Sequence, residues 1–162
     1  MRPKLGIIAG GGELVSELCS ACSKSGRQYF VVGIRGNADQ PSLQGIPHKI
    51  IRLGAIGELI SELRKQAVEE IVMVGSIQRP TWQEIRPDLR ALKLLPRFVS
   101  GGQGDGDILR IAITELENEG FQVLSPENIL PNLLCPKGIL GKNHPNENNK
   151  NDINIDFEIA KK

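Results

Sequence analysis

Residues 4–18 read KLGIIAGGGELVSEL, and this stretch decides the fold. A short apolar run leads into Gly10, Gly11 and Gly12, and apolar residues then recur at helical spacing. The order predicts a strand, a tight turn and a helix. Glycines let the backbone approach a ligand closely, and the unpaired N–H groups of a first helical turn attract anions. The turn is therefore a candidate phosphate site, although the stretch alone does not say whose phosphate it binds.

The same alternation of strand and helix continues along the chain. Apolar runs predict further strands at 29–34, 48–53, 70–75 and 121–124, and the helical spacing of apolar residues predicts helices at 58–65, 86–98 and 108–119. Parallel strands need crossover connections, and right-handed crossovers place their helices on both faces of the sheet. We therefore expect an α/β fold that is doubly wound and Rossmann-like, with a mostly parallel sheet and helices on both faces.

The loop after the strand at 70–75 is the second informative stretch, and residues 75–80 read GSIQRP. In open α/β sheets, ligands bind outside the carboxyl ends of the strands. If this strand neighbours the first one, Gly75, Ser76 and Arg79 lie beside the glycine turn. Arg79 can grip a phosphate through two parallel hydrogen bonds, or it can be a solvated loop arginine, and the sequence favours neither.

Length and charge limit the classes of protein that remain. The chain has 162 residues, which is enough for one domain with a core and a tail. Its net charge of +1 lacks the strong positive excess that is typical of nucleic-acid-binding domains, so we expect no nucleic-acid partner. No apolar run approaches the ~20 residues that span a bilayer, and the first one is too short for a signal peptide. These features predict a cytoplasmic protein.

Three cysteines, Cys19, Cys22 and Cys135, cannot all pair within one chain, which argues against a secreted disulfide framework. Cys19 and Cys22 have the spacing of a redox motif, but they fall two turns into the first predicted helix. A reactive pair sits instead at a helix N-terminus, where the dipole lowers the thiol pKa. We interpret these two cysteines as buried structural thiols.

Two carboxylates, Asp105 and Asp107, lie in a glycine-rich stretch before the helix predicted at 108–119. Carboxylates placed this close together can take part in a metal site. An aspartate just before a helix is first of all an N-cap, so the pair has two interpretations.

Residues 86–98 mix basic side chains with leucines. This mixture is typical of an amphipathic helix that covers a sheet, and that is the commoner interpretation. The same mixture can also contact acyl chains and anionic head groups at a membrane surface.

The composition changes after Lys142. Residues 143–154 form an Asn-rich polar run with little to bury, which predicts a linker in which His144 is a bystander. An amphipathic helix is expected to begin at Asp152 and to continue to the last residue without a cap. We therefore divide the chain into an α/β domain at 1–142 and a linker with the start of a helix at 143–162.

Five stretches of the chain, taken in order, resemble the N-terminal half of the LpxI family of UDP-2,3-diacylglucosamine pyrophosphatases. They are LGIIAGGG at 5–12, GSIQRP at 75–80, LKLLP at 92–96, GDGDILR at 104–110 and GILGK at 138–142. Together they extend over nearly the whole chain up to the Asn-rich run.

The resemblance implies a Mg²⁺-dependent hydrolase of lipid A biosynthesis. In that reaction water attacks the α-phosphorus of UDP-2,3-diacylglucosamine, which releases UMP and leaves 2,3-diacylglucosamine 1-phosphate. The resemblance also implies two domains with the lipid between them and most of the catalytic and metal-binding acids in the C-terminal one. We expect that domain to be absent here, so that this chain is a substrate-binding half with little or no activity alone. The lipid substrate implies a peripheral position at the inner membrane. The sequence is also compatible with a homodimer.

The site residues that we expect are Gly10, Gly11, Gly12, Gly75, Ser76 and Arg79 for the substrate, and Asp105 and Asp107 for the metal. Backbone N–H groups of the glycine turn and the guanidinium of Arg79 would hold the pyrophosphate, and Mg²⁺ would polarise the reacting phosphoryl oxygen. One position departs from the family pattern, because Gly106 stands where we expect an acidic or polar residue.

Two other functions remain compatible with the residues. The turn can bind NADP in an oxidoreductase or regulatory module, with Arg35 on the 2′-phosphate, although Val15 replaces the third glycine of the dinucleotide signature. The chain can also be a plain interaction domain in which the glycines only form a tight corner. A titration with UDP and NADP separates these hypotheses, because only the LpxI resemblance predicts a preference for uridine.

Overall fold

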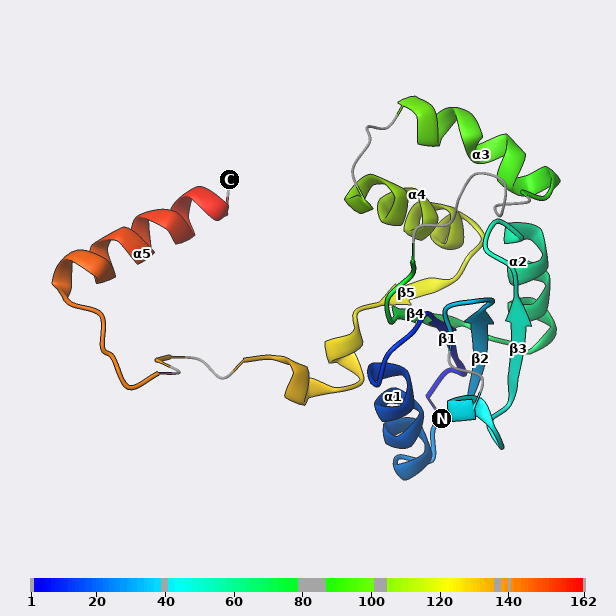
Figure 1. Cartoon of the computed structure of the whole chain (residues 1–162), viewed down its shortest axis with the longest axis horizontal. Helices are drawn as coiled ribbons and strands as arrows, with labels where there is room; N and C mark the ends of the chain where they lie inside the picture. Colours follow the sequence, from blue (N-terminus) through cyan, green and yellow to red (C-terminus); the bar gives the residue numbers. More distant parts are fainter. Residues whose placement is uncertain are drawn as a thin grey trace.

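A computed structural model of the chain describes residues 2–38, 41–78, 87–100, 105–135, 138–139 and 141–161. Its strands are β1 (Leu5–Ala9), β2 (Tyr29–Ile34), β3 (His48–Ile51), β4 (Glu70–Val74) and β5 (Gln122–Leu124). Its α-helices are α1 (Leu14–Lys24), α2 (Ile56–Lys65), α3 (Leu89–Ser100), α4 (Asp105–Asn118) and α5 (Glu147–Ala160). Three short 3₁₀ turns are η1 (Pro41–Leu43), η2 (Pro126–Asn128) and η3 (Pro131–Leu133). Figure 1 shows their arrangement.

The five strands form one parallel sheet in the order β3-β2-β1-β4-β5. β1 is central, and its first residue, Leu5, lies opposite Tyr29 of β2 on one side and Glu70 of β4 on the other. The chain thus runs outward from β1 in one direction and then returns to continue in the other. This order confirms the predicted doubly wound, Rossmann-like α/β fold, and it makes β1 and β4 neighbours.

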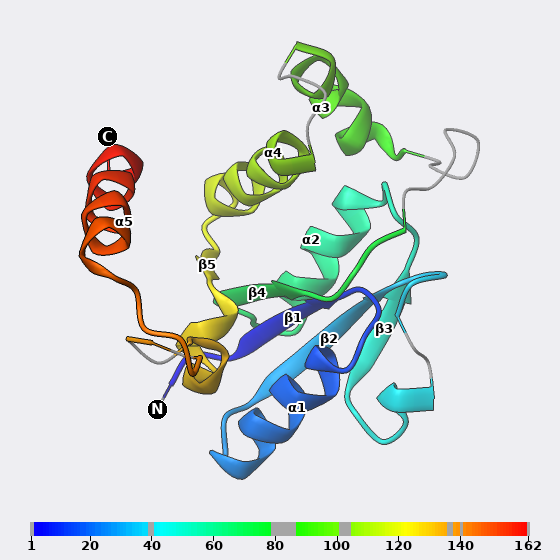
Figure 2. The ribbon, with the colours of Figure 1, turned by 60° about the vertical axis from the view of Figure 1, so that its left-hand side comes forward.

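Helices cover both faces of the sheet, with α1 on one face and α2 on the other (Figure 2). Leu18 of α1 packs in a cluster with Ile7 of β1, whereas Leu63 of α2 packs in a second cluster with Ile8. Because successive side chains of a strand point to opposite faces, neighbouring residues of β1 enter different clusters. A central strand covered in this way is buried along its whole length, which explains the unbroken apolar run that predicted it.

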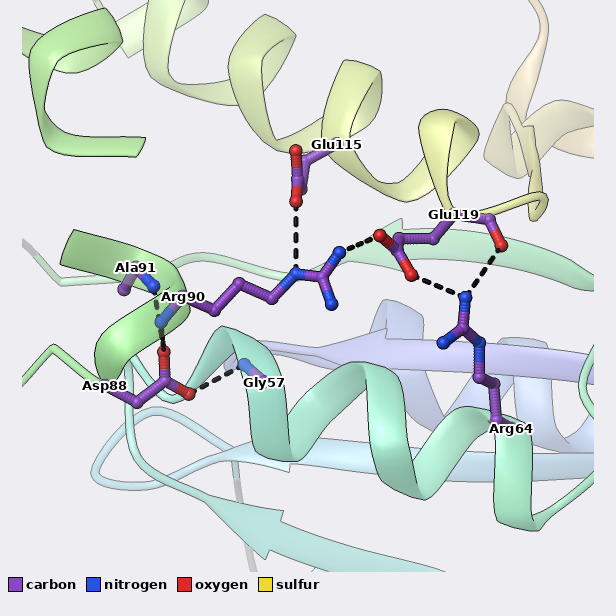
Figure 3. A network of polar contacts seen from close by, with 7 residues as sticks. All are labelled: Gly57, Arg64, Asp88, Arg90, Ala91, Glu115 and Glu119. Carbon is purple, nitrogen blue, oxygen red and sulfur yellow. Dashed lines mark hydrogen bonds and ion pairs between the residues drawn. The ribbon is translucent and has the colours of Figure 1, made fainter. Parts of the chain in front are cut away.

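Asp88 links the first turns of two helices (Figure 3). One carboxylate oxygen accepts a hydrogen bond of 2.7 Å from the N–H of Gly57 in α2. The other accepts hydrogen bonds of 3.0 and 2.8 Å from the N–H groups of Arg90 and Ala91, in the first turn of α3. Both helix ends gain acceptors for N–H groups that no helical carbonyl can satisfy, and the two helices are fixed at this point.

Ion pairs join the same two helices to α4 (Figure 3). Glu119, at the end of α4, pairs with Arg64 of α2 and with Arg90 of α3. Arg90 also contacts Glu115, with 3.2 Å between Nε and Oε1. Helices α2, α3 and α4 therefore form one connected layer.

The helix predicted at 86–98 lies at Leu89–Ser100 and packs mainly against α2 and α4. Ala91 and Leu94 are buried, while Leu89 is 81% exposed and Leu92 is 44% exposed. The two buried side chains confirm an amphipathic helix, but its main partners are α2 and α4 and not the sheet that it was predicted to cover. The exposed leucines leave an apolar strip on the outer side. No helix of the described ranges is both long and apolar enough to cross a membrane.

The C-terminal helix differs from the sequence prediction. α5 begins at Glu147, five residues before the expected start at Asp152, so much of the predicted linker is helical. Asn146 and Asn149 form a reciprocal capping box, in which each side chain accepts a hydrogen bond from the other's backbone N–H. The description of this run by composition alone missed that capping signal. α5 buries no residue and stands apart from the sheet (Figure 1).

Candidate functional site

The glycine turn and the loop after β4 are joined by backbone hydrogen bonds at the carboxyl edge of the sheet. The N–H of Gly11 donates to the carbonyl of Ser76 at 2.8 Å, and the N–H of Ser76 donates back to the carbonyl of Gly11 at 2.9 Å. The N–H of Gly10 donates to the carbonyl of Val74 at 2.8 Å. The structure thus brings the two predicted loops together, because β1 and β4 are adjacent.

Gly10 and Gly75 are needed for this close approach. A Cβ on Gly10 would lie 2.4 Å from the carbonyl oxygen of Ser76, and a Cβ on Gly75 would lie 2.6 Å from that of Gly11. Gly75 also has a φ of +90°, which other residues rarely adopt. Both glycines therefore serve the packing of one loop against the other.

The N–H groups of the turn divide into two sets. Those of Gly10 and Gly11 are used within the fold, whereas those of Gly12 and Glu13 have no acceptor among the described residues. Gly12 is exposed, has a φ of +108°, and would place a Cβ in open space. The donors that remain for an anion are therefore at Gly12, at Glu13 and in the first turn of α1.

Among the described residues, no side chain caps the start of α1. The hydroxyl of Ser16 instead donates a hydrogen bond of 2.6 Å to the carbonyl of Glu13. Uncapped N–H groups at a helix start carry the positive end of the helix dipole. The geometry suits a negatively charged oxygen. The carboxylate of exposed Glu13 lies nearby and would repel such an oxygen.

Asn37 is a member of this edge that the sequence analysis missed. Its side-chain oxygen accepts a hydrogen bond of 2.6 Å from the N–H of Gln78, in the loop after β4. Its carbonyl oxygen would lie 2.9 Å from a Cβ on Gly11. The signal was its position in the turn after β2, because the carboxyl ends of parallel strands share one edge, and asparagine often bonds backbone groups in turns.

Two arginines, Arg35 and Arg79, were proposed for anion binding, and the structure describes only the first. Arg35 is exposed in the turn that follows β2, and its N–H donates to the carbonyl of Ile51 at 2.7 Å. Its backbone therefore lies at the same edge as the glycine turn. Arg79 lies outside the described residues, and its contact with phosphate stays a prediction.

Asp105 and Asp107 lie in the first turn of α4, which begins at Asp105 and not at the expected position 108. The predicted loop between 100 and 107 is thus helical in its last three residues. Positions two apart on a helix do not face each other, so they are less suited to share one metal ion than neighbours in a loop. The side chains of both residues are outside the described set, and among described side chains no group of three or more acids, histidines or cysteines could hold a metal.

Cys19 and Cys22 are buried in α1, as predicted for structural thiols. Burial, with a smaller effect of Cys22, raises the pKa of the Cys19 thiol to about 11. Burial also raises the pKa of Cys22. Thiols with raised pKa values stay protonated at neutral pH and are poor nucleophiles, which argues against a redox pair.

The chain is similar in sequence to proteins of one family. A family model described as the LpxI N-terminal domain matches residues 4–133. The UDP-2,3-diacylglucosamine pyrophosphatase LpxI of Caulobacter vibrioides is 35% identical over 159 residues, which cover 98% of this chain and 56% of that protein. The chain therefore spans little more than half the length of this relative.

Solved structures show a more distant likeness. The Bordetella bronchiseptica enzyme WbmG in complex with NAD has 15% identity and a TM-score of 0.47, over 77% of this chain and 37% of that chain. The same enzyme with NAD and UDP has 16% identity and a TM-score of 0.46 over the same shares. Likeness at this level carries no information about ligands.

Proposed function

This chain belongs to the LpxI family, and we propose that it takes part in the hydrolysis of UDP-2,3-diacylglucosamine to UMP and 2,3-diacylglucosamine 1-phosphate in lipid A biosynthesis. Its share in the reaction is to bind the pyrophosphate at the carboxyl edge of β1 and β4. The substrate-binding part is residues 1–142. The basis for this role is the family match together with the geometry of the edge.

The observation that carries the proposal is the backbone pairing of Gly11 with Ser76. This pairing fixes the loop after β4 against the glycine turn and leaves the N–H groups of Gly12 and Glu13 without protein acceptors in the described ranges. Fixed, outward N–H groups at a helix start stabilise the charge of a phosphate without reorganisation. Arg79, one residue beyond Gln78 in the chain, would add a guanidinium to the same phosphates.

Hydrolysis needs more than this edge supplies. A positioned acid must orient the attacking water or bind a metal, and the described side chains hold no suitable cluster. We therefore propose that Mg²⁺ serves the reaction through acids whose side chains are outside the described set, with Asp105 and Asp107 as the candidates in this chain. The chain alone is expected to release UMP from UDP-2,3-diacylglucosamine slowly or not at all.

A lipid substrate suggests where the protein works. We propose a cytoplasmic protein that associates peripherally with the inner membrane, where UDP-linked diacylated glucosamine is found. The exposed Leu89 and Leu92 of α3, with exposed Lys93 next to Leu92, offer one surface for such contact.

Calorimetric titration of the purified chain with UDP and with NADP tests the proposed function. We expect UDP to bind and NADP to bind more weakly, and tighter binding of NADP would favour the dinucleotide-binding alternative. Two matched variants sharpen the result. Arg79→Ala should weaken UDP binding about tenfold or more, as the loss of a charge-assisted contact. Arg35→Ala should leave UDP binding unchanged but would weaken NADP binding if the alternative were correct.

A further inference from the structure

We propose that Asn37 is a positioning residue that fixes the outer part of the loop after β4 and thereby sets the geometry of the pyrophosphate site. The proposal rests on the proposed function, since it assigns Asn37 a role in that same site. It goes further because neither the motifs nor the family match single out Asn37. The juxtaposition that carries it is the hydrogen bond from the N–H of Gln78 to the side chain of Asn37.

The loop after β4 depends on hydrogen bonds more than on burial. All four described residues of the loop, Gly75 to Gln78, are exposed, and the one large apolar side chain, Ile77, is 47% exposed. Few buried contacts therefore hold it, and a segment of this kind opens easily unless polar contacts restrain it. The inner part has the pairing of Ser76 with Gly11, whereas the outer part has the bond to Asn37.

Asn37 is itself well fixed. Its N–H donates to the carbonyl of Ile34 at 3.0 Å, which anchors it to the end of β2. Its side-chain amide donates to the carbonyl of Arg35 at 3.4 Å, which orients the side-chain oxygen toward Gln78. A residue held at both its backbone and its side chain can transmit the position of β2 to the loop after β4.

The amide side chain also suits the charge of the site. An aspartate could accept the same hydrogen bond from Gln78, but it would bring a negative charge to an edge that binds pyrophosphate. It would also have no donor for the carbonyl of Arg35. Asparagine thus supplies the acceptor without the repulsion, so Asn37→Ala and Asn37→Asp have different expected effects.

Two variants and one control test the proposal on the whole chain. Asn37→Ala removes the acceptor, and Asn37→Asp keeps it but adds charge. Asn146→Ala removes a comparable bond of 2.9 Å, from the N–H of Asn149, at the start of the detached α5. Amide hydrogen exchange without ligand follows the N–H of Gln78, and calorimetric titration with UDP at low and high salt follows binding. Thermal unfolding checks that each variant is folded.

For Asn37→Ala we expect exchange at Gln78 to accelerate, and UDP affinity to fall by about 3- to 10-fold at both salt concentrations, since one modest hydrogen bond is lost. For Asn37→Asp we expect near-normal exchange, with a loss of affinity that shrinks as salt screens the charge. Asn146→Ala should match the wild-type chain in both measurements.

Unchanged exchange at Gln78 and unchanged UDP affinity in Asn37→Ala would overturn the positioning role. A salt-independent loss in Asn37→Asp with fast exchange at Gln78 would also contradict it, because the retained acceptor should hold the loop. If the wild-type chain failed to bind UDP while Asn37→Ala still accelerated exchange at Gln78, the hold of Asn37 on the loop would be confirmed and the proposed function overturned. The two claims therefore fail separately.

Discussion

Gly10 and Gly12 stand two residues apart in one turn and are glycines for different physical reasons. Gly10 has backbone of the neighbouring loop where its Cβ would be, at 2.4 Å from the carbonyl oxygen of Ser76. Gly12 has open space there but a φ of +108°. The first is a requirement of packing and the second a requirement of backbone conformation.

These reasons predict unequal costs for the same substitution. Gly10→Ala should lower the free energy of unfolding by about 2–3 kcal/mol or prevent folding, because backbone must move to admit the methyl group. Gly12→Ala should cost only about 1–2 kcal/mol, the strain of a positive φ. Urea denaturation of the two variants measures both, and equal losses would contradict the assignment.

Glu62 provides a pH-dependent contribution to stability. The hydrogen bond from Gln66, and with it Lys49, holds the pKa of this buried carboxyl below its ordinary value of 4.5, although burial opposes the shift. A depressed folded-state pKa stabilises the fold above the unfolded-state value, and this contribution is lost as the pH falls through the folded-state value. Glu62→Gln should therefore be less stable than wild type at pH 7, and the gap should close below about pH 4.5.

Urea denaturation between pH 3 and 7 checks this prediction. Glu58→Gln is the matched control, because Glu58 also pairs with Lys49 but its side chain is 45% exposed. An exposed pair of this kind contributes ~0–1 kcal/mol, so this variant should differ little from wild type. A constant gap for Glu62→Gln across the pH range would contradict the shift.

At the scale of elements, Asp88 connects α2 and α3 with one side chain. Asp88→Ala removes acceptors from both helix starts and should lower the free energy of unfolding by about 2 kcal/mol, at about 1 kcal/mol for each cap. Asp88→Asn retains one carbonyl oxygen and should lose about half as much. Asn146→Ala, which uncaps the detached α5, should leave the main transition in urea unchanged. Equal effects of all three variants would contradict the double cap.

The positions of the strands were predictable because the burial of a parallel sheet on both faces leaves near-continuous apolar runs. Their order in the sheet came from the structure. Helix starts were less predictable. The helix expected to start at position 108 begins at Asp105, and α5 begins at Glu147 through an Asn capping box that polar composition obscured. Helix boundaries depend on single caps and on tertiary contacts, which periodicity does not show.

The site was predictable only from the rule that ligands bind outside the carboxyl ends of parallel strands, which lie at one edge of the sheet. That rule placed Gly75 and Ser76 beside the glycine turn. It could not show that the N–H groups of Gly10 and Gly11 are consumed by backbone bonds, nor that Asn37 accepts a bond from Gln78. These features depend on the three-dimensional fit of three loops, and a pattern along one chain carries no such distances.

At the scale of the whole molecule, α5 is separable from the α/β domain. All its described residues are exposed, including Phe157 at 64% and Ile159 at 65%. Removal of residues 147–162 should therefore leave the Tm within about 2 °C, because no buried contact is lost. Differential scanning calorimetry measures this, and a markedly lower Tm would show that the helix packs on the domain.

The central claim is that the carboxyl edge of β1 and β4 binds the pyrophosphate of a UDP-linked substrate. Amide chemical shifts of the labelled chain during titration with UDP test it most directly, since each N–H reports separately. We predict saturable shifts that concentrate at Gly12, at Glu13 and around Ser76, with smaller shifts for NADP at equal concentration. Shifts absent from these amides, or equally strong with NADP, would contradict the account.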